Sequence, residues 1–292
     1  MFDPKPTRYP FPEFTDRHYL VVRKNRGIVF DKDYPYIDTS KPFLFRRFCA
    51  RVLIFAIAFP VLTVRLGLVI RGKENRKKFR KLLSGGFVSV SNHVHLWDFL
   101  AVMKALYFRK PAILSWDRNI NGENGTMIRL VGGIPIPNEG IRATAAFSRA
   151  VERYLKDGNW LHVCAEGSMW EYYQPIRPFK PGAFYFACKA GVPVLPIAFS
   201  YRKPNRLYRL FGSQALFTLN IGEPLFFRED LPQNEAVEDM TVRAHREVCR
   251  LAGIDPDENL YPPLFRSSRR VDYYTTEYGT GRKDEKKDPA AE

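Results

Sequence analysis

One short stretch of the sequence, SVSNHVHLWDF at residues 89–99, holds three side chains that could do chemistry together. His93, His95 and Asp98 lie within six positions of one another. Two imidazoles and a carboxylate can ligate a zinc or manganese ion, and a histidine beside an aspartate can act as a general base with its orienting partner. A third interpretation is an ordinary polar turn. The first interpretation predicts a metal hydrolase, the second a transferase without a metal, and the third neither.

The spacing of His93 and Asp98 decides whether they can form a pair. Five residues turn a regular helix by about 140°, so the two side chains would not meet on one helix. They can meet if His93 lies on a turn and Asp98 lies in the first turn of the following helix. The carboxylate would then accept a hydrogen bond from one ring nitrogen and leave the other free to take a proton from a hydroxyl. A general base of this kind contributes roughly 10²- to 10⁴-fold to a rate.

A metal site on the same stretch would need further ligands from elsewhere in the chain. The remaining histidines show no ligand-like clustering: His18, His162 and His245. The sequence therefore favours a metal-free pair of His93 and Asp98. It also predicts that His95 takes no part in proton transfer.

Alternating strand and helix patterns surround this stretch and would hold it at one edge of a sheet. FVSVSN at residues 87–92 has a period of two, which predicts a strand that ends just before His93. Further strands are predicted at 112–116, 133–137, 159–165, 192–200 and 215–222, and helices at 143–158, 180–191 and 235–252. This alternation predicts an α/β fold with a mixed, largely buried sheet flanked by helices.

The net charge of +15 on 292 residues predicts an anionic partner. Seven basic residues and one acid lie in the run RGKENRKKFRK at residues 71–81. The four cysteines are far apart, which argues for reduced thiols and against a disulfide framework or a zinc knuckle.

The basic run follows an apolar segment, FLFRRFCARVLIFAIAFPVLTVRLGLVI at residues 43–70, that predicts contact with a membrane. Between Arg51 and Arg65 the uncharged part would span about 20 Å as a helix, short of the roughly 30 Å of a bilayer core, and Pro60 would kink it. We therefore expect a helical hairpin or an interfacial element that dips into one leaflet, with a buried core helix as the alternative. No signal peptide is predicted, so the expected location is the cytoplasmic face of a membrane, monotopic or peripheral.

Four stretches in a fixed order resemble the motif blocks of the glycerolipid acyltransferases, the family of the bacterial 1-acyl-glycerol-3-phosphate acyltransferases. NHVHLWD matches the family signature N-H-x-x-x-x-D, and LVGGIPIP at 130–137 resembles the second block. AEGSMW at 165–170 is similar to the third block, usually P-E-G-T-R. FKPGAFYFACKAGVPVLPIAF at 179–199 is similar to the helix and V-P-I-x-P strand that follow. The resemblance covers roughly residues 65–225.

The resemblance implies an O-acyltransferase that needs no metal and no bound cofactor. His93 would deprotonate an acceptor hydroxyl, which attacks the thioester of an acyl-CoA or acyl-carrier protein, and Asp98 would orient His93. Glu166, Gly167 and Ser168 would shape the acceptor pocket. The implied acceptor is a lysophospholipid, first of all 1-acyl-glycerol-3-phosphate, in phospholipid biosynthesis.

Two positions depart from the family pattern. Met169 and Asn138 stand where the third and second blocks usually carry an arginine. Neither side chain can imitate a bidentate phosphate donor. The missing charge could come from Arg142, Arg177 or Lys180, or the acceptor could carry a different headgroup.

These features divide the chain into four expected parts: an irregular arm at 1–42, a helical membrane-anchoring segment with the basic run at 43–83, an α/β acyltransferase domain at 84–266 and a disordered tail at 267–292. The expected partners are anionic membrane lipids, the lysophospholipid and the acyl thioester.

Two other functions stay open from sequence. One is a metal-dependent hydrolase built on the histidine and aspartate cluster. The other is a non-catalytic protein that binds lipid or nucleic acid through its positive charge. Nucleic acid is disfavoured because the basic run adjoins an apolar segment and lacks the interleaved aromatic residues of a single-strand groove.

Overall fold

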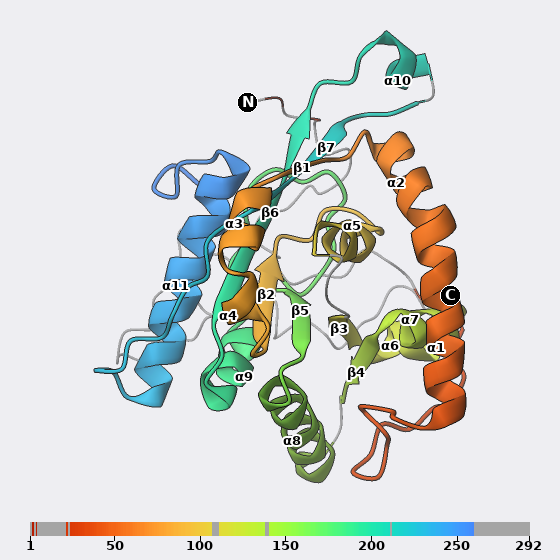
Figure 1. The fold of residues 1–292 in the computed structure, drawn as a ribbon, viewed down its shortest axis with the longest axis vertical. Helices are drawn as coiled ribbons and strands as arrows, with labels where there is room; N and C mark the ends of the chain where they lie inside the picture. Colours follow the sequence, from red (N-terminus) through yellow and green to blue (C-terminus); the bar gives the residue numbers. More distant parts are fainter. Residues whose placement is uncertain are drawn as a thin grey trace, which may run out of the picture.

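The computed structural model describes residues 2, 4, 22, 24–106, 111–137, 140–210 and 212–259. Within these residues a seven-stranded sheet forms the centre of the molecule (Figure 1), in the order β1-β7-β6-β2-β5-β3-β4. The strands are β1 (Val69–Arg71), β2 (Phe87–Ser91), β3 (Pro111–Trp116), β4 (Gly133–Ile136), β5 (Trp160–Cys164), β6 (Val194–Arg202) and β7 (Leu216–Ile221). The sequence predicted six of them to within a few residues. It missed β1, because three residues are too few to show alternation.

The sheet is mixed, as the sequence predicted. Five neighbouring strands, from β6 to β4, run parallel, whereas β7 is antiparallel to β6 and carries β1 parallel to itself. β2 and β5 pair so that Ser91 lies opposite Cys164. The carboxyl ends of these two strands therefore meet at one edge, where an open α/β sheet commonly forms its site.

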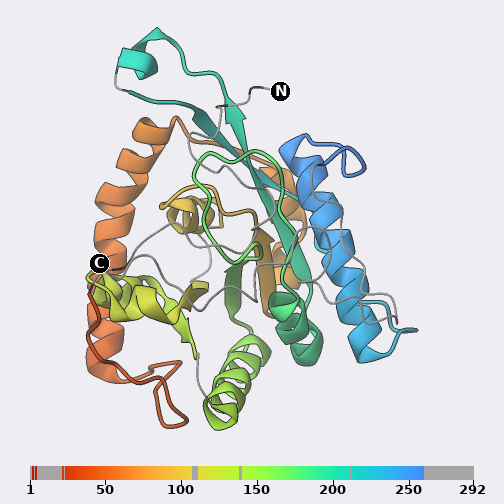
Figure 2. The same ribbon diagram turned by 180° about the vertical axis from the view of Figure 1, so that it is seen from behind.

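Helices cover both faces of the sheet (Figures 1 and 2). One face packs against α8 (Ile141–Lys156), α9 (Gly182–Ala190) and α11 (Gln233–Ala252). The other packs against α2 (Phe59–Leu66), α4 (Arg80–Leu83) and α5 (Asp98–Ala105). The remaining helices are α3 (Lys73–Lys78), α6 (Asp117–Asn121), α7 (Gly125–Val131) and α10 (Arg206–Leu210). α8 shows how the pattern works, since its buried residues recur at every fourth position: Ala143, Phe147, Val151 and Leu155.

The apolar segment forms one continuous helix, so of the two expected forms the hairpin was wrong and the interfacial element stays a prediction. α1 (Lys41–Leu53), a π-helical turn (Ile54–Ala58) and α2 follow one another without a break along one side of the molecule (Figure 1). The wider π turn ends just before Pro60 and gives the proline ring room against the preceding carbonyl, so the chain stays helical. By length and composition this 26-residue helix could cross a membrane.

This helix is fixed to the α/β domain along one side only. Arg47 Nη2 donates to Pro111 O at 3.0 Å, and Arg65 Nη1 donates to Ser213 Oγ at 2.9 Å. Ile54 packs with Met103 of α5 and Val131 of α7. The opposite side exposes large apolar side chains: Phe48, Val52, Phe55, Val61 and Val64. It is therefore not a buried core helix, and its exposed apolar side is compatible with membrane association.

The arm and the tail are described only in part. Residues 24–40 contain no helix or strand and lie on the domain, where Asn121 Oδ1 accepts from Ile28 N at 2.8 Å and Asn121 Nδ2 donates to Ile28 O at 3.0 Å. The predicted disordered tail at 267–292 and Asn138 lie outside the described residues.

Charging the exposed side of the helix should release the protein from lipid. We expect the double substitution Phe48→Asp and Phe55→Asp to lower vesicle binding by about tenfold or more, because each ring contributes roughly 1.5–3 kcal/mol when buried in an apolar phase. Both rings are mostly exposed, at 61% and 71%, so the melting temperature should stay the same. Co-sedimentation with anionic vesicles measures the binding, with exposed Val29→Asp as the control. Unchanged sedimentation would place the lipid contact elsewhere.

Candidate active site

His93 and Asp98 form the pair that their spacing allowed. His93 lies on the turn after β2, and Asp98 is the first residue of α5. His93 Nδ1 and Asp98 Oδ2 are 3.0 Å apart. The same carboxylate oxygen accepts the backbone N–H groups of Val94 at 2.7 Å and His95 at 3.0 Å. These three bonds tie the turn that carries His93 to the first residue of α5. The other ring nitrogen of His93, Nε2, is not used by Asp98.

Glu166 supports this turn from beneath. Its Oε2 accepts the backbone N–H of His93 at 2.8 Å and Arg177 Nη2 at 2.8 Å, while its Oε1 accepts Arg177 N at 2.7 Å. Arg177 Nη1 also donates to Ser168 Oγ at 2.7 Å, and its guanidinium lies over the Trp170 ring. Glu166 and Arg177 are 3% and 1% exposed, so a buried ion pair neutralises the carboxylate that joins the third sequence block to the first through His93 N–H.

A polar row on β2 and β5 leads to the same turn. Trp160 Nε1 donates to Ser89 Oγ at 2.7 Å, and Ser89 Oγ lies 2.9 Å from His162 Nδ1. His162 Nε2 lies 3.8 Å from Cys164 Sγ. The row ends at Cys164, beside His93. The sequence pattern does not predict this row of polar residues, because only the register of β2 against β5 brings them together.

His93 and Cys164 change each other's pKa. Burial alone would lower the pKa of His93, but the Cys164 thiolate and the Asp98 carboxylate outweigh it and raise that pKa. Burial alone would raise the pKa of Cys164, but the imidazoles of His93 and His162 lower it well below that of an ordinary thiol. A thiolate and an imidazolium therefore stabilise each other here.

The His95 imidazole packs among aromatic rings, and the prediction that it takes no part in proton transfer stays a prediction. Its Nδ1 accepts the Trp97 backbone N–H at 3.1 Å, and its ring packs edge-on against Trp97, Tyr172 and Phe217. In the part of the chain that the structure describes, no three His, Cys, Asp or Glu side chains are grouped as metal ligands. The three-ligand site thus lacks the geometry that it would need.

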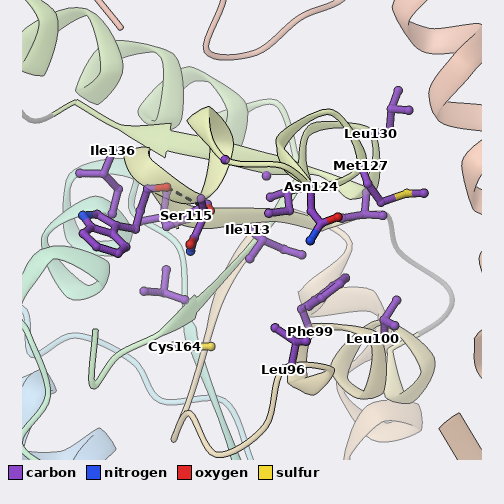
Figure 3. Close-up of a pocket in the computed structure, with 18 of the residues that line it drawn as sticks. Leu96, Phe99, Leu100, Ile113, Ser115, Asn124, Met127, Leu130, Ile136 and Cys164 are labelled. Atoms are coloured by element: carbon purple, nitrogen blue, oxygen red, sulfur yellow. Dashed lines mark hydrogen bonds between the residues drawn. The ribbon is translucent and has the colours of Figure 1, made fainter. Parts of the chain in front are cut away.

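A pocket of about 1670 Å³ opens beside His93 and Cys164 (Figure 3). Its walls are mostly apolar and come from the helix at 41–66, α5, α7, β3 and β4. In the close-up, Leu96, Phe99 and Leu100 lie across the pocket from Met127 and Leu130. A cavity of this kind fits a long apolar group better than a small polar one.

The predicted acceptor residues separate into three groups. Gly167 and Lys180 line the pocket, as does Met169. Gly167 has a φ of +83°, and a Cβ there would lie 2.8 Å from Lys180 Cε, so this turn requires glycine. Glu166, Ser168 and Arg177 lie buried beneath the pocket, and Arg142 is exposed on α8. Contact of these residues with a substrate stays a prediction.

A histidine–aspartate pair on a mixed sheet, open to a large apolar pocket, has the geometry of a general base and its orienting carboxylate beside an apolar cavity. Residues 67–200 match the family model described as acyltransferase. All four sequence blocks fall within that range, so this part of the chain is similar to the acyltransferases.

Two further matches are to individual proteins. Human 1-acyl-sn-glycerol-3-phosphate acyltransferase beta is 31% identical over 115 residues, which are 39% of this chain and 41% of that protein. The match thus spans about two fifths of that relative. The solved 1-acyl-sn-glycerophosphate (LPA) acyltransferase, PlsC, from Thermotoga maritima is 26% identical, with a TM-score of 0.44, over 70% of this chain and 86% of that chain.

Breaking the buried ion pair should destabilise the whole domain. Arg177→Met leaves the Glu166 carboxylate buried without its cation, which we expect to lower the free energy of unfolding by about 3–5 kcal/mol. Adding Glu166→Gln to that variant should recover part of the loss, because the unpaired charge is then gone. Chemical denaturation measures both. Lys156→Met breaks the exposed pair with Glu152 and should cost less than about 1 kcal/mol. Equal losses of stability in Arg177→Met and Lys156→Met would contradict the stabilising role of the buried ion pair.

Proposed function

We propose that the protein transfers a fatty acyl group from an acyl thioester, acyl-CoA or acyl-carrier protein, to the hydroxyl of a lysophospholipid. The observation that carries this proposal is the His93–Asp98 pair at the mouth of the apolar pocket, within residues of acyltransferase type. The pair supplies the base that an alcohol acceptor needs, and the pocket supplies room for an acyl chain. The chemistry requires no metal and no bound cofactor.

The pocket is the proposed site of the acyl chain. Phe45, Cys49, Leu53 and Ile57 of the apolar helix form part of its wall. The same helix exposes its other side. A lipid-embedded helix would therefore place the pocket next to the phase in which acyl chains are dissolved.

Lys180 is the proposed partner of the acceptor phosphate. Its side chain crosses Gly167, next to Met169, and it lines the same pocket as His93. An ammonium here can serve as a point charge for phosphate where the family usually has a guanidinium. We therefore propose 1-acyl-glycerol-3-phosphate as the first acceptor to try. The basic run at 71–81 would bind anionic headgroups or the phosphates of the donor at the cytoplasmic face.

Removing the base should stop the reaction without releasing the enzyme from lipid. We expect His93→Ala to lower acyl transfer to 1-acyl-glycerol-3-phosphate by about 10²- to 10⁴-fold, because no group remains to take the hydroxyl proton. Product mass after incubation with palmitoyl-CoA measures the rate, and co-sedimentation with vesicles should be unchanged. The matched control is His95→Gln, whose amide oxygen can still accept the Trp97 N–H. Retained transfer by the alanine variant would refute the mechanism.

Removing the Lys180 ammonium should weaken binding of the acceptor rather than slow the chemical step. We expect Lys180→Met to raise the KM for 1-acyl-glycerol-3-phosphate by about ten- to a hundredfold, the value of one charge-assisted contact, with a smaller change in kcat. Lys189→Met is the control, since Lys189 pairs with Glu152 outside the pocket. If KM does not change, the phosphate binds elsewhere, or the true acceptor has another headgroup.

A further inference from the structure

The loop between β6 and β7 projects from the molecule and ends in a short apolar tip. It carries α10, which Figures 1 and 2 show beyond the end of α2. Leu207 and Leu210 lie three positions apart on α10, so they share one side of its turn. They are 59% and 83% exposed and belong to neither hydrophobic cluster on the two faces of the sheet. The packing of the domain therefore does not account for these two leucines.

The sequence around this tip carries only positive charge. Lys203, Arg206 and Arg209 are exposed on the loop. The sequence contains no Asp or Glu between Glu171 and Glu223. Exposed leucines among basic side chains suit the headgroup layer of an anionic membrane, because the leucines reach the acyl boundary while the cations stay beside the phosphates.

The loop is held against the end of the apolar helix. Arg202 Nη2 donates to the carbonyl oxygen of Gly67, the residue that ends α2. From the last turn of the same helix, Arg65 Nη1 donates to Ser213 Oγ at 2.9 Å. A Cβ at Gly67 would lie 3.3 Å from Tyr208 Cζ, so the Tyr208 ring packs on this glycine. These contacts give the tip a fixed place relative to the exposed side of the helix.

We propose that α10 is a second lipid-contact element, and that its partner is the anionic headgroup layer of a membrane. The exposed apolar side of the helix supplies the first contact, and α10 continues that contact past the end of α2. Of the residues that the structure describes, none from this loop lines the pocket. The inference therefore concerns membrane binding and does not depend on the reaction that the pocket performs.

Two lipid contacts on one rigid body fix how the protein lies on a membrane. Arg47, near the first end of the helix, and Arg65, near its second end, both bond to the α/β domain. A helix that crossed the bilayer would draw this polar domain into hydrocarbon, where each unpaired polar group is costly. With α10 among the headgroups, the helix instead lies along one leaflet, its exposed side buried by about 5–10 Å.

Vesicle binding by the full-length protein tests this proposal. We expect Leu210→Asp to weaken binding to vesicles of phosphatidylcholine and phosphatidylglycerol by about tenfold, because a leucine leaves the acyl boundary and a negative charge enters the headgroup layer. Co-sedimentation over a range of lipid concentrations measures the binding. The matched control is Phe226→Asp, since this ring is 54% exposed and the residue lies beside α11, where Arg243 Nη2 donates to Phe226 O. The control should bind as the native protein does.

Removal of charge alone separates headgroup binding from apolar contact. Arg206→Gln combined with Arg209→Gln should weaken binding to the same vesicles by about fivefold for each charge, and should leave binding to pure phosphatidylcholine unchanged. Arg149→Gln combined with Arg153→Gln, two exposed residues of α8, lowers the net charge equally. This control should change binding by less than about twofold, because screened charges away from the membrane contribute little.

Photocross-linking from position 210 identifies the partner directly, without relying on the stability of a charged variant. A benzoylphenylalanine in place of Leu210 should attach to lipid when the vesicle-bound protein is irradiated, and one in place of Phe226 should not. Native vesicle binding by Leu210→Asp, or no lipid adduct at position 210, would overturn the proposal. An adduct to an acyl-carrier protein in place of lipid would also overturn it, and would assign the tip to an acidic protein. None of these measurements uses acyl transfer, so a failure of the proposed function would leave them unchanged.

Discussion

The Glu166 carboxylate is the constraint on which the site depends. It accepts the backbone N–H of His93 on one oxygen and holds Arg177 on both, with almost no exposure to solvent. A buried charge of this kind is tolerated only when every lone pair finds a donor, so the turn, the third block and the loop at Arg177 must all fold together. The histidine is thus positioned through its backbone, by a residue that never has to touch the substrate.

The sequence predicted the parts of the site that lie close together in the chain. The five-residue spacing was enough to pair His93 with Asp98, and alternation was enough to place most strands. The sequence could not predict the neighbours of Cys164 and His162, because the register of β2 and β5 brings them together and no local pattern encodes that register. Of the two forms expected for the apolar segment, the hairpin was wrong, because a π turn absorbs Pro60, which was expected to kink the helix. Arg177, one of three candidates for the acceptor charge, forms a buried pair with Glu166 that sequence spacing did not indicate.

The helix at 41–66 takes part in both of the protein's proposed tasks. Its exposed side fits a lipid phase, and its inner side supplies part of the pocket wall. The pocket is therefore complete only while the helix lies on α5 and α7. The proposed lipid contact and acyl-chain binding would share one rigid element, and the position of the protein at a membrane would then be coupled to the shape of its pocket.

The π turn at Ile54–Ala58 sets the rotational phase of this helix. Such a turn amounts to one extra residue in an α-helix, and one residue corresponds to about 100° around the axis. Leu62 and Leu66 face the sheet while Val61 and Val64 face outward, an arrangement that holds only with that extra residue counted. Had the sequence been one residue shorter here, the second half of the helix would be rotated by about 100°, and Leu62 and Leu66 would take the exposed directions of Val61 and Arg65. The π turn therefore determines which side of the second half of the helix packs against the sheet.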